Sequence, residues 1–202
     1  MSIDIEILKA LLNVIVAIFT LIFGLFVGKR LAVYWAIRQK RKEIELNSLN
    51  QFYELYGEFF SIWKLWNWLK ENKKENSPAY KEKHWKLLNR ACIAEAKVET
   101  ILLKITSERY LSKEDIANLG RFRQAYQTLG EFIKYDNKIE WYYSENPEYL
   151  SFKKLSVSVA SLLRIDTIFQ EKLPNPKEGF KAFKKVTSNL WEDNWLVIDN
   201  EK

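Results

Sequence analysis

The feature that most constrains this chain is the uninterrupted apolar run over residues 10–28, ALLNVIVAIFTLIFGLFVG, which contains no charged residue. At about 1.5 Å of rise per residue, a helix of this length just spans a hydrocarbon core of about 30 Å. Because backbone amides cannot reach water inside a bilayer, a helix is the only economical conformation for the run. The sequence therefore predicts a transmembrane helix over residues 10–28, with a short extracytoplasmic tail over residues 1–9.

The main alternative to a membrane anchor is a cleaved signal peptide. Two features disfavour it: the charges before the run are mixed, and no small-x-small cleavage site stands out after it. A buried helix of a soluble protein is the third and least favoured alternative. We therefore expect an uncleaved, single-pass anchor.

The residues after the run set the expected orientation. Residues 29–42 contain no acid and these six cations: Lys29, Arg30, Arg38, Lys40, Arg41 and Lys42. Cytoplasmic flanks are enriched in Lys and Arg, so the N-terminus should lie outside the cell membrane and everything after residue 28 in the cytoplasm. We expect the six cations to contact anionic lipid headgroups.

One face of the predicted transmembrane helix differs from the others. It carries small or polar residues at spacings of three and four: Asn13, Ala17, Thr20, Gly24 and Gly28. Small residues let helix backbones approach closely in lipid, and Gly24 and Gly28 have the GxxxG spacing. We favour self-association into a homo-oligomer through this packing stripe. The alternative is chance, because glycine is common in membrane helices.

Charge and composition exclude several classes of function. The net charge is +6, but seven of the 32 Lys/Arg and only two of the 26 Asp/Glu precede residue 43, so the remainder is nearly neutral. We therefore expect no nucleic-acid partner. The one cysteine, Cys92, and the one histidine, His84, exclude an intramolecular disulfide and a multi-histidine or cysteine-rich metal site within one chain. No nucleotide-binding, zinc-protease or CxxC motif is present, so we predict no cofactor and no enzymatic activity.

After the anchor, the periodicity predicts helices only. Residues 29–50 read as a basic juxtamembrane stalk, with a kink favoured at 47–50, where Asn47, Ser48 and Asn50 are poor helix formers. Residues 51–69 carry a broad aromatic face that indicates a bundle core rather than a ligand pocket. Capping residues stand before Pro78, Pro147 and Pro176 and divide the rest into helices near 78–106, 112–135, 147–172 and 176–189.

The predicted fold class is therefore all-α. An antiparallel bundle of about four helices occupies residues 51–173, and a short amphipathic helix and tail occupy residues 174–202. The last helix either lies on the membrane surface or covers one end of the bundle. Residues 136–145 are ambiguous and would extend the third bundle helix. Residues 195–198 carry a weak strand signal.

Three charged residues fall on or beside the apolar faces of the predicted helices: Glu95, Arg123 and Asp166. An isolated buried carboxylate is strongly disfavoured, so inward-pointing acids must pair or take up protons. We predict a polar cluster with a structural role. A cationic ligand or a metal is the functional alternative.

Two functions fit these features. The first is a membrane-anchored, self-associating scaffold or regulatory protein whose bundle binds an unidentified cytoplasmic protein. The second is a membrane-active effector of a bacterial defence or toxin system, with the bundle as sensor. Depolarisation of cells that depends on residues 1–30 would distinguish the second from the first.

Overall fold

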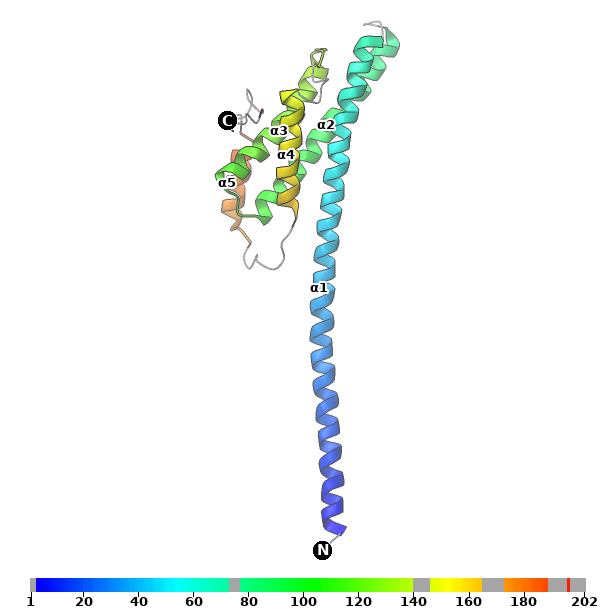
Figure 1. Cartoon of the computed structure of the whole chain (residues 1–202), viewed down its shortest axis with the longest axis vertical. Coiled ribbons are helices and arrows are strands. Elements are labelled where there is room, and N and C mark those ends of the chain that lie inside the picture. Colours follow the sequence, from blue (N-terminus) through cyan, green and yellow to red (C-terminus); the bar gives the residue numbers. More distant parts are fainter. Residues whose placement is uncertain (1–2, 73–76, 140–145, 165–172, 189–195, 197–202) are drawn as a thin grey trace. The chain divides into compact units, whose positions relative to one another are not determined.

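The computed structural model describes residues 3–72, 77–139, 146–164, 173–188 and 196 (Figure 1). Within these residues every element is a helix and no strand occurs, which confirms the all-helical prediction for this part of the chain. The elements are these: α1 (Ile3–Asn72), α2 (Pro78–Glu108), α3 (Lys113–Lys134), α4 (Pro147–Leu163) and α5 (Pro176–Val186). The chain divides into an N-terminal unit, Met1–Leu46, and a C-terminal unit, Asn47–Lys202.

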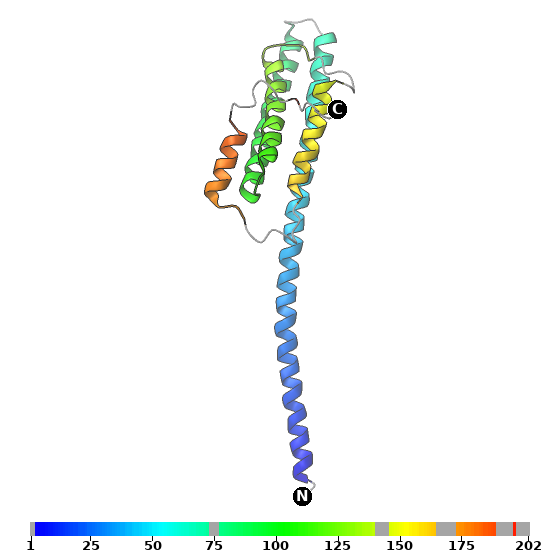
Figure 2. The ribbon, with the colours of Figure 1, turned by 60° about the vertical axis from the view of Figure 1, so that its left-hand side comes forward.

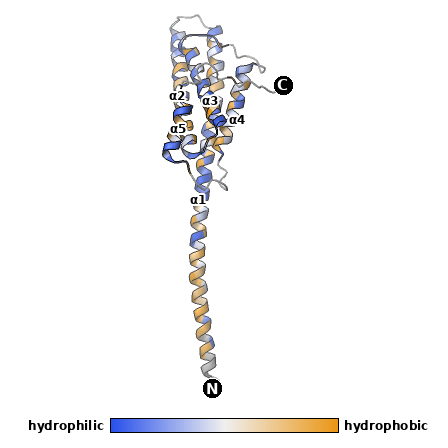
Figure 3. Ribbon diagram, turned by 90° about the vertical axis from the view of Figure 1, so that its left-hand side faces the viewer, coloured by the Kyte–Doolittle hydropathy of each residue, from blue (hydrophilic) through white to orange (hydrophobic). Residues whose placement is uncertain are grey.

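The N-terminal unit is the first part of α1. Its large apolar side chains are exposed, and Figure 3 shows this part of α1 mostly hydrophobic with hydrophilic segments between. A helix this long and apolar meets the length and composition required to cross a membrane. Residues 47–50 are also helical, so the poor helix formers there do not interrupt α1.

The starts of the later helices follow the predicted capping logic. Ser77, Asn146 and Asn175 each accept a hydrogen bond from a backbone amide of the first turn, and a proline follows each of them. Ser112 and Asp115 form a capping box, as do Asn175 and Glu178. These N-termini confirm the predictions made from local sequence.

The core of the C-terminal unit is aromatic. Phe152 of α4 lies at its centre: its ring centroid is 3.7 Å from that of Phe59 on α1 and 5.8 Å from that of Phe122 on α3. The rings of Tyr56 and Tyr126 also contact it, at 5.7 and 5.8 Å. The aromatic face of residues 52–69 is therefore buried by several neighbours, as its width predicts.

The helices of this unit pack in a definite order. α3 contacts α2 and α4, and α5 packs on both α2 and α3 (Figures 1 and 2). The last part of α1 joins them through side chains: Arg90 of α2 binds Glu58, and the Tyr126 hydroxyl of α3 donates to the Leu55 carbonyl over 2.9 Å. The last helix, α5, packs one face against α2 and α3 and leaves its other face exposed.

Several features differ from the predictions. α4 ends at Leu163, because Arg164 is extended and its carbonyl accepts a hydrogen bond from the Arg109 guanidinium. Leu173, the last residue of the range predicted for the bundle, is exposed. α3 ends at Lys134, so residues 136–139 do not extend it. Of residues 195–198 only Leu196 is described; it packs half-buried against the core without strand pairing.

Candidate functional site

The predicted packing stripe lies entirely on the exposed surface of α1. Its residues are Asn13, Ala17, Thr20, Gly24 and Gly28. A Cβ built on Gly24 or Gly28 meets nothing within 4 Å, and a hollow beside Gly24 is lined by Phe19, Phe23 and Val27. The Thr20 hydroxyl donates to the Val16 carbonyl of its own helix over 2.8 Å. The stripe is therefore suited to close van der Waals packing, and the Asn13 amide is the polar group that it could use for a hydrogen bond to another helix.

The cations predicted to contact headgroups alternate with aromatic residues. The Arg30 guanidinium lies 4.9 Å from the Phe26 ring centroid, and that of Arg38 lies 5.8 Å from the Trp35 ring. Lys29, Lys40, Arg41 and Lys42 are exposed. Aromatic rings beside Lys and Arg are typical of a membrane–water interface, where each ring is apolar on its faces and the cation stays hydrated.

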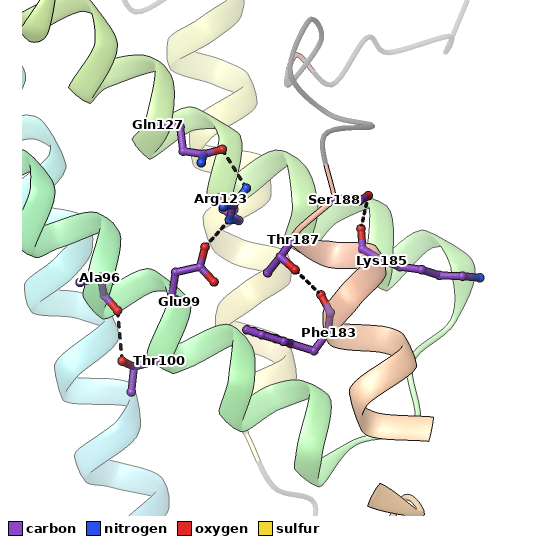
Figure 4. Close-up of polar contacts among 9 residues, drawn as sticks. All are labelled: Ala96, Glu99, Thr100, Arg123, Gln127, Phe183, Lys185, Thr187 and Ser188. Atoms are coloured by element: carbon purple, nitrogen blue, oxygen red, sulfur yellow. Dashed lines mark hydrogen bonds and ion pairs between the residues drawn. The ribbon is translucent and has the colours of Figure 1, made fainter. Parts of the chain in front are cut away.

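The predicted polar cluster is arranged differently from the expectation. Arg123 binds the carboxylate of Glu99 and also donates to the Gln127 side chain over 2.9 Å (Figure 4). Glu95 lies one turn earlier on α2 and is half-buried, and Asp166 lies outside the described residues. The structure thus brings Arg123 together with Glu99, which joins α2 to α3.

A second ion pair joins α1 to α2. Arg90 binds both carboxylate oxygens of Glu58, at 2.7 and 2.8 Å, and its guanidinium also donates to Ser61 over 3.0 Å. The hydrogen bond from Arg90 holds the pKa of Glu58 below its usual value, and the pKa of Arg90 is raised in turn. The sequence does not identify Arg90 as the partner of Glu58, because the two residues belong to different helices.

The end of α3 is fixed by an aspartate in the left-handed region. Asp136 has φ of 59°, and the amides of Asp136 and Asn137 donate to the carbonyls of Ile133 and Phe132. This is a Schellman motif in which aspartate occupies the position that glycine usually takes. Aspartate tolerates this conformation better than most residues.

The side chains around Asp136 explain why it is tolerated there. Its carboxylate accepts from the Tyr80 hydroxyl and lies 3.3 Å from Lys70 Nζ. Burial and the Asp136 carboxylate raise the pKa of Tyr80 to about 12. The Trp66 indole donates to the Asn137 carbonyl over 2.8 Å, so α1, α2 and the end of α3 are tied together at one point.

His84 completes this end of the unit. Its Nε2 lies 2.7 Å from the Ile133 carbonyl oxygen, and a carbonyl can only accept, so Nε2 carries the proton. Every polar group named at this end therefore holds a backbone or side-chain partner. These contacts hold the last part of α1, the first part of α2 and the end of α3 together. Within the described residues, no group of three or more His, Cys, Asp or Glu is placed to hold a metal ion.

The feature best suited to bind something is a groove between α1 and α4, with a volume of about 410 Å³. The α1 wall is aromatic, and the α4 wall is small or aliphatic. We call the following residues the α1–α4 groove: Phe52, Tyr53, Tyr56, Lys153, Ser156, Val157, Ala160, Ser161 and Arg164.

The groove combines an apolar wall with two cations. Tyr53 and Val157 are exposed although both are apolar over most of their surface. Lys153 Nζ lies 4.2 Å from the Tyr149 ring centroid, and a hydrogen bond with Tyr149 raises the pKa of Lys153. The hydroxyls of Ser156 and Ser161 donate to carbonyls of their own helix. The groove therefore offers apolar contact and positive charge, and its serines are not poised as nucleophiles.

Periodicity does not reveal this groove. It identifies the face of residues 52–69 that is apolar, but the part of that face left uncovered depends on how α4 packs.

No protein-family model matches the chain, and neither a curated protein nor a solved structure does.

Proposed function

We propose that this protein is a membrane-anchored, non-enzymatic interaction protein. In this proposal residues 10–28 cross the cell membrane with the N-terminus outside, and residues 29–50 follow as a basic stalk. An antiparallel four-helix bundle over residues 51–173, with α5 packed on it, then lies in the cytoplasm. The observation that supports a binding role is the exposed α1–α4 groove. Soluble surfaces seldom leave contiguous aromatic and aliphatic side chains uncovered without a partner.

The groove indicates the chemistry of the partner. Tyr53, Tyr56 and Val157 favour an apolar face, and a volume of about 410 Å³ lies within the usual range of ligand-binding clefts. Lys153 and Arg164 at the groove favour a carboxylate on the bound segment. We therefore propose a protein partner that presents apolar residues flanked by an acid.

Site-specific photo-crosslinking in membranes tests the groove. A benzoylphenylalanine replacing Tyr53 should crosslink to a partner, and Val157→Lys should abolish that product. The control is the same amino acid at Trp85, which is exposed on α2 and lies outside the groove. Equal products from both positions, or none from Tyr53, would show that the groove is not the binding site.

Cys92 gives a test of the orientation because it is the only cysteine and is exposed. A membrane-impermeant maleimide should label it only after intact cells are permeabilised. A Ser2→Cys variant in a Cys92→Ser background should react in intact cells. Labelling of Cys92 in intact cells would reverse the proposed topology.

Self-association of the anchor is tested by crosslinking in membranes with the C-terminal unit deleted. Gly24→Ile and Gly28→Ile should reduce dimers and higher oligomers, because the added side chains separate the backbones. Leu25→Ile conserves volume off the stripe and should change nothing. If all three variants crosslink equally, any oligomer is held by the C-terminal unit instead.

A further inference from the structure

The two faces of α5 have different surroundings. On one face Gly179 and Val186 are buried against the helices beneath, and Phe183 packs half-buried against the core (Figure 4). A Cβ on Gly179 would lie 2.9 Å from the Thr106 carbonyl oxygen, so α5 sits very close to the end of α2. This contact fixes which face of α5 points outward.

The outward face carries lysines around a large apolar side chain. Lys177, Lys181 and Lys184 are exposed, and Phe180 between them is 68% exposed. Lys177, Phe180 and Lys184 follow the three- and four-residue spacing of one helix face. An exposed aromatic residue among lysines is typical of helices that lie in a membrane interface.

Residues from two connections extend this surface. Tyr110, after α2, and Leu173, before α5, are both exposed, and the Tyr110 hydroxyl donates to the Leu173 carbonyl over 3.2 Å. Arg109 and Lys181 line the same shallow hollow beside Tyr110. We define the α5 patch as these six residues: Arg109, Tyr110, Leu173, Lys177, Phe180 and Lys181.

The charge of the patch is positive. Two nearby acids take part in capping: Glu178, which lines the same hollow, accepts from the Asn175 amide at 3.3 Å, and Asp115 accepts from the Ser112 amide at 2.9 Å. Glu108, directly before Arg109, is half-buried. Four basic residues, Arg109, Lys177, Lys181 and Lys184, outnumber Glu108 and Glu178, so this surface carries a net positive charge. The complement of such a surface is an apolar layer beneath negative charges, which is the profile of an anionic bilayer.

The patch lies at the end of the C-terminal unit where the chain arrives from the anchor. Lys104 donates to Ser48, so the first residues of this unit lie beside the last turns of α2, five positions before Arg109. Figure 2 shows the α2–α3 connection and the start of α5 at this same end. Residues 29–46 connect this end of the unit to the predicted transmembrane helix.

We propose that the α5 patch rests on the anionic headgroups of the bilayer that holds the anchor, an inference that depends on the anchoring proposed above. Phe180, Leu173 and Tyr110 insert at the interface, and Arg109, Lys177 and Lys181 contact phosphates. Tethering makes the contact intramolecular, so an affinity too weak to recruit a free domain suffices here. The α1–α4 groove uses other helices and stays open to its partner.

The test uses the full chain reconstituted in vesicles of phosphatidylcholine, with or without phosphatidylglycerol. A fluorophore is attached to single cysteines in a Cys92→Ser background, and a headgroup-spin-labelled lipid quenches it. Phe180→Cys and Leu173→Cys report the patch. Trp85→Cys, on α2, and Val157→Cys, in the groove, are matched controls, because Trp85 is as exposed as Phe180 at 68% and Val157 as exposed as Leu173 at 70%. Phe19→Cys reports the anchor.

We expect several-fold stronger quenching at positions 180 and 173 than at 85 and 157, only with phosphatidylglycerol and less at high salt. Lys177→Gln with Lys181→Gln should reduce quenching at position 173, by up to about fivefold per cation in the contact equilibrium. Equal quenching at all four positions, none, or quenching at 157 alone would overturn the proposal. If a fluorophore at position 19 is deeply buried while 180 stays unquenched, the patch fails and the anchor stands. If position 19 is not buried, the anchoring itself fails.

Discussion

The two units use the same residue types against opposite surroundings. Phe19 and Phe23 in the N-terminal unit are 71% and 72% exposed, whereas Phe59 in the C-terminal unit is 1% exposed, although all three belong to α1. In residues 10–28 large apolar side chains occur around the helix except at the packing stripe, and after residue 51 most of them lie on one broad buried face. The distribution of apolar residues around a helix, rather than their number, therefore indicates whether lipid or protein is its solvent.

The largest effect is expected from charged residues placed in the predicted transmembrane helix. Phe19→Arg combined with Phe23→Arg should prevent stable insertion, because each arginine near the middle of a transmembrane helix costs about 3–4 kcal/mol relative to phenylalanine. The measurement is resistance of the full chain to alkaline extraction from membranes.

Phe19→Leu with Phe23→Leu is the matched control and should stay in the membrane. Retention of the double arginine variant after extraction would mean that residues 10–28 are not what holds the protein there.

The second prediction breaks the core of the C-terminal unit. Phe152→Ala should lower the free energy of unfolding by about 3–5 kcal/mol, because it leaves a cavity among the rings of Phe59, Phe122 and their neighbours. Urea unfolding of the full chain in detergent, followed by circular dichroism, measures the change.

Val157→Ala removes an exposed side chain from the same helix and should change stability by less than about 0.5 kcal/mol. Similar midpoints for the two variants would show that Phe152 is not central to the core.

The third prediction compares two glycines that differ in the space around them. Gly179→Ala should destabilise the C-terminal unit by about 1–3 kcal/mol, because the new Cβ would meet the Thr106 carbonyl oxygen at 2.9 Å. Gly130 in α3 has nothing within 4 Å of an added Cβ, so Gly130→Ala should stabilise the unit by up to about 1 kcal/mol. Hydrogen exchange of the α5 amides separates local detachment of α5 from global unfolding, and effects of the same sign at both positions would contradict the packing.

Features fixed by neighbouring residues are those that the sequence predicts. Ser77, Asn146 and Asn175 cap helices through amides two or three positions away, so their role is visible in the chain itself. The end of α4 is different, because the Arg164 carbonyl is held by Arg109, 55 positions away. The end of α3 likewise depends on Asp136 with Tyr80, from another helix.

The candidate site also depends on contacts between residues that are distant in the sequence. An apolar face on residues 52–69 is predictable, but the α1–α4 groove exists because α4 covers only part of that face. The sequence predicts Glu95 in a polar cluster with Arg123, but the structure pairs Arg123 with Glu99, one helical turn later on α2. Which turns face each other depends on the relative shift of α2 and α3, and no local pattern encodes that.

The smallest expected effect concerns the ion pair on the polar side of α1. Arg90 lowers the pKa of Glu58, so the folded state favours the carboxylate. The ion pair contributes to the free energy of unfolding above pH 4.5, the ordinary pKa of the glutamate. This contribution is lost as the pH falls through the lower pKa that Glu58 has in the folded protein. Both side chains are about one-third exposed, at 36% and 34%, so the pair contributes at most about 1 kcal/mol. Glu58→Gln should therefore lower stability slightly at neutral pH and flatten its decline on the acid side. Glu82→Gln, which breaks the fully exposed pair with Lys86, should alter that acid limb less. Urea midpoints measured across the acid range decide between them: if the two variants follow the same curve, the contact between α1 and α2 adds nothing beyond an ordinary surface pair.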